Sequence, residues 1–131
     1  IVVSVDSGTR ETFIKVKRYD FYNQVWENIK KYASVQPETD RLKTKFILIP
    51  DLNDSEDEIN TWINKSLESN VKHLAFDVEM MWYNKNKENI PQRIYDLVKY
   101  TIEKIRENNL NLELIDRGYI LAQNIKELKS N

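Results

Sequence analysis

The chain has 131 residues, the length of one domain, with 40% hydrophobic residues, 31% charged residues and a net charge of −1. This balance creates no field that would recruit nucleic acid or an anionic membrane surface. The absence of cysteine excludes disulfides, thiolate zinc sites and iron–sulfur ligation within these residues, and no Gly-rich phosphate loop is present. No apolar run approaches the ~20 residues of a membrane span and no signal peptide is visible, so we expect a cytoplasmic protein with no membrane partner.

The first residues already belong to an alternating apolar run, with no Met and no polar lead-in before it. We therefore expect the 131 residues to be a fragment of a longer polypeptide. A processed or tag-cleaved N-terminus is the alternative.

Hydrophobic periodicity and capping residues predict strands and helices that alternate along the chain. Asp20 precedes apolar residues at helical spacing, Ser55 and Glu58 form a capping box, and Pro91 starts the longest helix. The stretches 7–20, 35–41 and 80–89 are predicted to hold no regular element. In chain order the predicted elements are a strand at 1–6, a helix at 20–33, a strand at 43–50, a helix at 55–69, a strand at 71–79, a helix at 91–108, a strand at 110–115 and a helix at 119–129.

Strict alternation of this kind predicts an α/β fold with parallel strands and right-handed crossovers. Two architectures satisfy it: half of a (β/α) TIM-like partial barrel, and a small doubly wound sheet. Both place ligands at the C-terminal ends of the strands, in the loops that lead into the helices.

Polar side chains stand at those ends. Ser4 and Asp6 share one face of their strand, and Asp77 and Glu79 share one face of theirs. Asn53 follows the strand between them in sequence. A carboxylate is uncommon on a covered sheet face unless it is paired or functional, so these residues are the candidates for a binding site.

Three segments carry a resemblance to a known family. Residues 4–9 read SVDSGT and are followed by Glu11-Thr12-Phe13 and Lys17-Arg18; residues 42–54 read LKTKFILIPDLND and are followed by Glu56 and Glu58; residues 73–79 read HLAFDVE. In this order and spacing they resemble the fourth, fifth and sixth strands of radical S-adenosylmethionine (SAM) enzymes. The resemblance covers about residues 1–108, the C-terminal half of that family's partial (β/α)6 barrel.

The resemblance implies a cofactor site. Ser4 and Asp6 match positions that contact the ribose or the methionine end of SAM, and Asn53 matches the polar residue of the loop after the fifth strand. Ala75 and Phe76 lie in the segment whose backbone meets the adenine. Asp77 and Glu79 would then line the cavity near the substrate.

The resemblance also implies what these residues cannot do. The family's Cys-x3-Cys-x2-Cys loop holds a [4Fe–4S] cluster, and this chain has no cysteine to supply it. The fragment is therefore expected to be inactive alone and to bind no cofactor tightly, with SAM and the cluster belonging to the intact protein. No catalytic residue and no metal ligand is assigned, and the substrate is not indicated.

Each candidate has a simpler interpretation. Ser4 and Asp6 could serve turn chemistry, Asp77 and Glu79 could pair with a lysine or arginine, and Asn53 could belong to a helix cap. His73 is better explained as a strand-start residue than as a ligand. The aromatic residues near the first helix, interleaved with lysines, suggest either nucleic-acid stacking or a core face beside a solvated face, and the net charge favours the second.

Two other functions are compatible with the sequence. Asp6, Asp77 and Glu79 could serve a metal-dependent or acid/base enzyme on the same architecture, or the chain could be a non-catalytic α/β binding module. A half-barrel also leaves the edge of strand 1–6 unpaired, so we expect a homo-oligomer through that edge.

Overall fold

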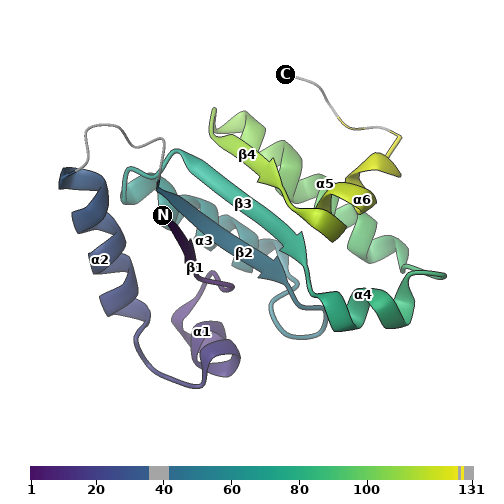
Figure 1. The fold of residues 1–131 in the computed structure, drawn as a ribbon, viewed down its shortest axis with the longest axis horizontal. Coiled ribbons are helices and arrows are strands. Elements are labelled where there is room, and N and C mark those ends of the chain that lie inside the picture. The colour runs from purple at the N-terminus through teal and green to yellow at the C-terminus, as the bar shows by residue number, and fades with distance from the viewer. Residues whose placement is uncertain (36–41, 127, 129–131) are drawn as a thin grey trace.

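The computed structural model describes residues 1–35, 42–126 and 128, and it has an α/β fold in which strands alternate with helices (Figure 1). The elements are β1 (Val2–Ser4), α1 (Arg10–Lys17), α2 (Tyr22–Val35), β2 (Lys43–Leu48), α3 (Glu56–Glu68), β3 (His73–Val78), α4 (Met80–Asn86), α5 (Gln92–Glu107), β4 (Asn111–Leu114) and α6 (Asp116–Gln123).

All strand pairs are parallel, and the strands lie in the order β1-β2-β3-β4. A doubly wound sheet would reverse its strand order at a switch point, whereas this order is sequential. The predicted α/β fold is therefore confirmed, and its parallel sheet is consistent with half of a TIM-like partial barrel.

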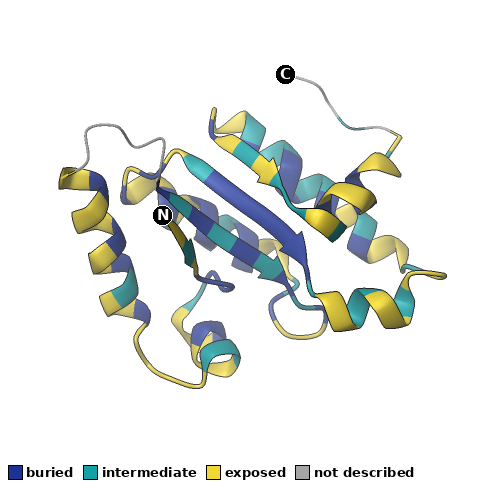
Figure 2. Cartoon of the chain, in the orientation of Figure 1, coloured by how far each residue is buried: buried dark blue, intermediate teal, exposed yellow. Residues whose placement is uncertain are grey.

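Two helices, α3 and α5, cover one face of the sheet, and the start of α6 packs against the end of β3 at Phe76 and Asp77. In Figure 1, α3 and α5 lie behind the strands, and no described helix crosses in front of β2 and β3. The burial of β2 alternates in agreement: Thr44, Phe46 and Leu48 are buried, whereas Lys43, Lys45 and Ile47 are half-buried. Figure 2 shows the same alternation as blue and teal bands along β2.

Aromatic side chains form the centre of the core between the sheet and α3. The Phe46 ring lies 5.0 Å from the Trp62 ring and 6.2 Å from the Phe76 ring, measured between centroids. The Trp62 indole N–H donates to the Thr44 hydroxyl over 3.0 Å, and Thr44 also bonds Ser66 over 2.9 Å. The buried polar groups of this layer are thus paired, which removes the penalty of burying them.

Four helices differ from the prediction. α2 lies two residues later at each end than the predicted range 20–33. Stretches 7–20 and 80–89, predicted to hold no element, contain α1 and α4. The last helix begins at Asp116 rather than at 119, and the end of the predicted range 119–129 includes residues outside the described part. Gly118 lies inside α6 because its Cα packs on β3: a Cβ there would come within 2.8 Å of the Phe76 carbonyl oxygen.

None of the helices in the described ranges has the length and apolar character needed to cross a membrane.

Candidate functional site

We call the face of the sheet opposite α3 and α5 the open face. By strand alternation and register it carries ten side chains: Val2, Ser4, Lys43, Lys45, Ile47, His73, Ala75, Asp77, Asn111 and Glu113. Three of the seven predicted site residues, Ser4, Ala75 and Asp77, lie on it. Ser4 is exposed, whereas Ala75 and Asp77 are buried between longer neighbours.

Asp6 ends the β1 segment in the left-handed region, with a φ of 50° that Asp tolerates better than most residues. Its Oδ1 accepts from the Ile47 amide over 2.8 Å, and its Oδ2 accepts from the Lys17 ammonium over 2.9 Å. The residue is only 6% exposed. Asp6 therefore ties the end of β1 both to β2 and to α1.

Asn53 makes a second tie between the same strand ends. Its Oδ1 accepts from the Ile49 amide over 2.7 Å, and its Nδ2 donates to the carbonyls of Asp6 and Ile47 over 3.0 and 2.9 Å. The residue is 1% exposed. The N-terminal cap of α3 is Ser55, whose hydroxyl accepts from the Glu58 amide, so Asn53 is not that cap.

Asp77 is fixed by the start of α6. Its Oδ1 accepts from the Val78 and Gly118 amides over 2.7 and 3.2 Å, and its Oδ2 accepts from Arg117 Nη2 over 2.5 Å. Arg117 Nε also donates to the Val78 carbonyl over 2.8 Å. The simpler interpretation, in which Asp77 pairs with a lysine or arginine, is met by Arg117, which lies in α6.

Replacing Arg117 with methionine is expected to cost about 2 kcal/mol of unfolding free energy, because Asp77 would keep a buried charge without its cation. A fully buried pair would cost more, but the Arg117 side chain is 22% exposed. The matched control is Arg93→Met, which removes the ion pairs to Asp51 and Asp54. The Arg93 side chain is 52% exposed, so its loss should cost at most about 1 kcal/mol. Urea unfolding of both variants measures the two losses in unfolding free energy. Equal losses would contradict a stabilising role for the Arg117–Asp77 ion pair.

The remaining predicted residues lie elsewhere. Glu79 caps α4, its Oε2 accepting from the Trp82 amide over 2.6 Å. The Phe76 side chain is in the core, on the face covered by α3 and α5, and its carbonyl accepts from the Ile115 amide over 2.9 Å. The Phe76 side chain therefore does not reach the open face. Asp6, Asp77 and Glu79 thus have separate partners, and the described residues contain no group of three or more His, Cys, Asp or Glu that could hold a metal ion.

No family model matches this chain, and no curated protein or solved structure matches it. The comparisons therefore assign no family.

Sequence reasoning missed the tie made by Glu58. Its carboxylate crosses to the loop after β1, where it accepts from the Gly8 amide over 2.5 Å, the Thr9 amide over 2.9 Å and the Thr9 hydroxyl over 2.6 Å. The capping-box pattern identified Glu58 but assigned its carboxylate to its own helix. No spacing in the sequence indicates the contact with Gly8 and Thr9.

Tyr22 supports the same loop, because its hydroxyl donates to the Gly8 carbonyl over 2.5 Å. Burial, together with the nearby charges of Glu58 and Glu68, raises the Tyr22 pKa to about 12. An unfolded tyrosine ionises near its ordinary pKa of about 10. The protonated Tyr22 therefore contributes stability that is complete below about pH 10 and is lost as the pH rises toward 12.

We expect Tyr22→Phe to remove this part of the alkaline destabilisation. The variant should be less stable than the wild type at about pH 9, where it lacks the bond to Gly8, and the gap should narrow above about pH 11. Urea midpoints at both pH values measure the difference in stability between the variant and the wild type. A gap that stays constant would show that Tyr22 titrates alike in the folded and unfolded chain.

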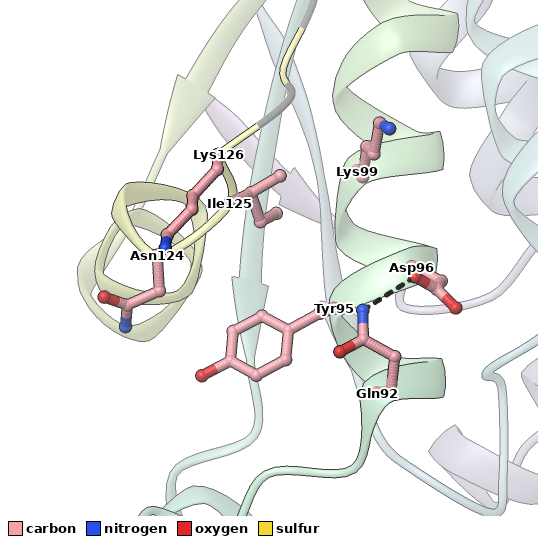
Figure 3. A pocket seen from close by; sticks show the side chains of 7 residues that line it. All are labelled: Gln92, Tyr95, Asp96, Lys99, Asn124, Ile125 and Lys126. Carbon is pink, nitrogen blue, oxygen red and sulfur yellow. Dashed lines mark hydrogen bonds between the residues drawn. The ribbon is translucent and has the colours of Figure 1, made fainter.

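A hollow of about 440 Å³ lies between α5 and the segment that follows α6 (Figure 3). Gln92 Nε2 donates to Asp96 across one turn of α5 at its rim, over 3.0 Å. None of the predicted site residues lines it. Its lining residues are Gln92, Tyr95, Asp96, Lys99, Asn124, Ile125 and Lys126.

Proposed function

We propose that the chain forms the C-terminal half of a radical SAM domain and that its open face contributes to binding SAM and a substrate. The observation that carries the proposal is the sheet itself: four parallel strands lie in sequential order, α3 and α5 cover one face, and the other face carries polar groups toward the strand ends. This arrangement is what half of a barrel would present to its lumen.

The chemistry of the open face suits the nucleoside part of SAM. Ser4 offers an exposed hydroxyl to a ribose diol, and Ile47 offers a half-buried apolar surface on the neighbouring strand for the adenine. Asp6 borders both residues, since its carboxylate holds the Ile47 amide. In this proposal Asp6 and Asn53 fix the strand ends that carry Ser4 and Ile47. Asp77 borders the place proposed for the adenine.

The residues present do not fit the iron–sulfur cluster of that family, because the chain has no cysteine and supplies no thiolate ligand. The proposal therefore places the cluster loop in another part of a longer polypeptide, with the present chain inactive on its own. A cytoplasmic location, and self-association through the edge of β1, belong to the same proposal.

The test is a titration of the ¹⁵N-labelled chain with S-adenosylhomocysteine, which contains the adenosine part of SAM. We expect amide shifts at Ser4, Ile47 and Ala75, on three neighbouring strands of the open face. Residues of the hollow in Figure 3, such as Tyr95 and Lys99, are the internal control and should not shift. No shift on the open face at saturating ligand would overturn the proposal, as would an intact polypeptide without a three-cysteine loop.

A further inference from the structure

A second hollow, of about 270 Å³, lies between α2 and α3, and we call it the α2–α3 hollow. It shares no residue with the open face or with the hollow in Figure 3. Its lining residues are Asn23, Trp26, Glu27 and Lys30 of α2, Lys65 and Glu68 of α3, and Ser69, which ends α3.

One of the two buried residues that line this hollow carries an unpaired donor. Trp26 is 5% exposed, and its indole N–H is buried with no hydrogen-bond partner among the described residues. The indole N–H of Trp62, in the core, donates instead to the Thr44 hydroxyl over 3.0 Å. Buried donors are nearly always paired in folded proteins, so an unpaired one beside a cavity marks a place where a ligand or a water supplies the acceptor.

Ser69 is the other buried lining residue, and it is also 5% exposed. Its amide belongs to the end of α3, where it donates to the Lys65 carbonyl over 3.0 Å. Its hydroxyl has no hydrogen-bond partner in the part of the chain that the structure describes. The buried part of the hollow therefore offers two donors, an indole and a hydroxyl, that the fold leaves unused.

Charges of both signs surround these donors. Each helix contributes one glutamate and one lysine, three residues apart and therefore on one helix face: Glu27 and Lys30 from α2, and Lys65 and Glu68 from α3. Lys65 lies over the Tyr22 ring, 5.7 Å from its centroid, and within the described ranges no ion pair involves any of the four. Because the four charges cancel, a simple anion or cation would meet as many like charges as opposite ones.

We propose that the α2–α3 hollow binds a free α-amino acid. The ligand carboxylate would accept from the Trp26 indole and the Ser69 hydroxyl, and its ammonium would face the glutamates. The volume lies just below the roughly 300 Å³ at which pockets for drug-sized ligands begin, which suits a smaller molecule. The inference is independent of the proposed function, because no lining residue lies on the open face.

The ligand must open the rim of the hollow to reach the buried indole N–H. Glu27, Lys30 and Glu68 are long side chains that are exposed, and such side chains change rotamer freely. Binding is therefore best read at the indole N–H itself.

The test follows the indole N–H signals of the ¹⁵N-labelled chain during titration with glycine, and separately with acetate and methylammonium, which each carry one of its charges. We expect glycine to shift the Trp26 signal saturably and at about tenfold lower concentration than either single-charge probe, because only glycine engages both signs. The Trp62 signal is the internal reference and should not move, since its N–H is already bonded to Thr44.

Paired substitutions identify the groups that hold each end of glycine. The double variant Glu27→Gln with Glu68→Gln should lose the advantage of glycine over acetate. The double variant Lys30→Met with Lys65→Met should lose its advantage over methylammonium. Lys31→Met is the matched control, because it removes an exposed lysine of α2 that does not line the hollow, and it should bind glycine as the wild type does.

Two results would overturn the amino-acid site. A Trp26 signal that none of the three probes moves would mean that the buried donor is not open to a ligand. Equal responses to glycine and acetate in the wild type would mean that the glutamates do not recognise an ammonium group. Neither result depends on whether the open face binds a nucleoside, so this proposal and the SAM proposal fail separately.

Discussion

Replacing Gly8 with alanine is expected to cost about 3 kcal/mol of unfolding free energy or more, the largest effect predicted for this chain. A Cβ at Gly8 would lie 2.0 Å from the Glu58 carbonyl oxygen and 2.7 Å from its carbonyl carbon. Both atoms belong to the backbone of α3, so no side-chain rotation relieves the clash. Moving the loop away would break the bonds from Gly8 and Thr9 to the Glu58 carboxylate.

The neighbouring variant Ser7→Ala is the control for Gly8→Ala. Ser7 is fully buried, and its hydroxyl has no hydrogen-bond partner within the part of the chain that is described. Removing it deletes no bond, so the stability should stay within about 1 kcal/mol of the wild type. Urea unfolding followed by tryptophan fluorescence measures both variants. A Gly8→Ala chain as stable as Ser7→Ala would show that the loop does not need its close approach to α3.

The second large effect is expected for Asn53→Ala, at about 3 kcal/mol. The substitution removes three hydrogen bonds at once and leaves the Ile49 amide and the carbonyls of Asp6 and Ile47 without their partner. Each of these groups lies where water replaces the side chain poorly, because Asn53 is 1% exposed. Hydrogen exchange should also quicken at the ends of β1 and β2, which Asn53 joins.

Asn108→Ala serves as the matched control for Asn53. Asn108 is exposed at the end of α5 and makes one bond to the Lys104 carbonyl, so its loss should cost about 0.5 kcal/mol or less. Chemical denaturation of the two variants side by side gives the comparison. Equal losses would mean that Asn53 is not the tie between the strands.

The strands and the long helices could be predicted because their burial follows a simple period. The alternation of β2 separates Phe46 from Ile47 as clearly in the structure as in the sequence. The predicted end of α5, residue 108, lies one residue beyond Glu107, because the apolar stripe of that helix stops where Asn108 follows. Periods of 2.0 and 3.6 report which face meets the core, and that face decides these elements.

The short helices were missed because their stability comes from caps and tertiary contacts rather than from an apolar stripe. α1 starts at a Thr9 cap, whose hydroxyl accepts from the Thr12 amide, and only Thr12 and Phe13 of this helix are buried. α4 has no fully buried residue; Trp82 and Tyr83 are half-buried against the core, and Glu79 caps the helix. Thr9 is a preferred N-cap residue and is visible in the sequence, whereas glutamate is not among the preferred N-cap residues, so only α1 carried a capping signal.

The same distinction applies to the candidate site: the side-chain alternation of a strand could be predicted, and its tertiary contacts could not. Alternation predicted that Ser4 shares a face with Asp6 and that Asp77 shares a face with Glu79. In the structure Ser4 and Asp77 lie in their strands, whereas Asp6 has a φ of 50° beyond the end of β1 and Glu79 caps α4. The partners at the strand ends could not be predicted, because Lys17, Arg117 and Glu58 reach them from elements distant in sequence. Contacts of this kind depend on how the helices pack, and a single sequence carries no period for them.

The sequential strand order has a consequence for how this chain is made. Each strand pairs with the one synthesised just before it: Val2 meets Lys43, Lys43 meets His73, and His73 meets Asn111. A growing chain on the ribosome can therefore complete each pairing as soon as the next strand emerges, without holding an earlier strand open for a later one. Each new strand adds to the same edge of the sheet, so no strand has to be inserted between two strands that are already hydrogen-bonded.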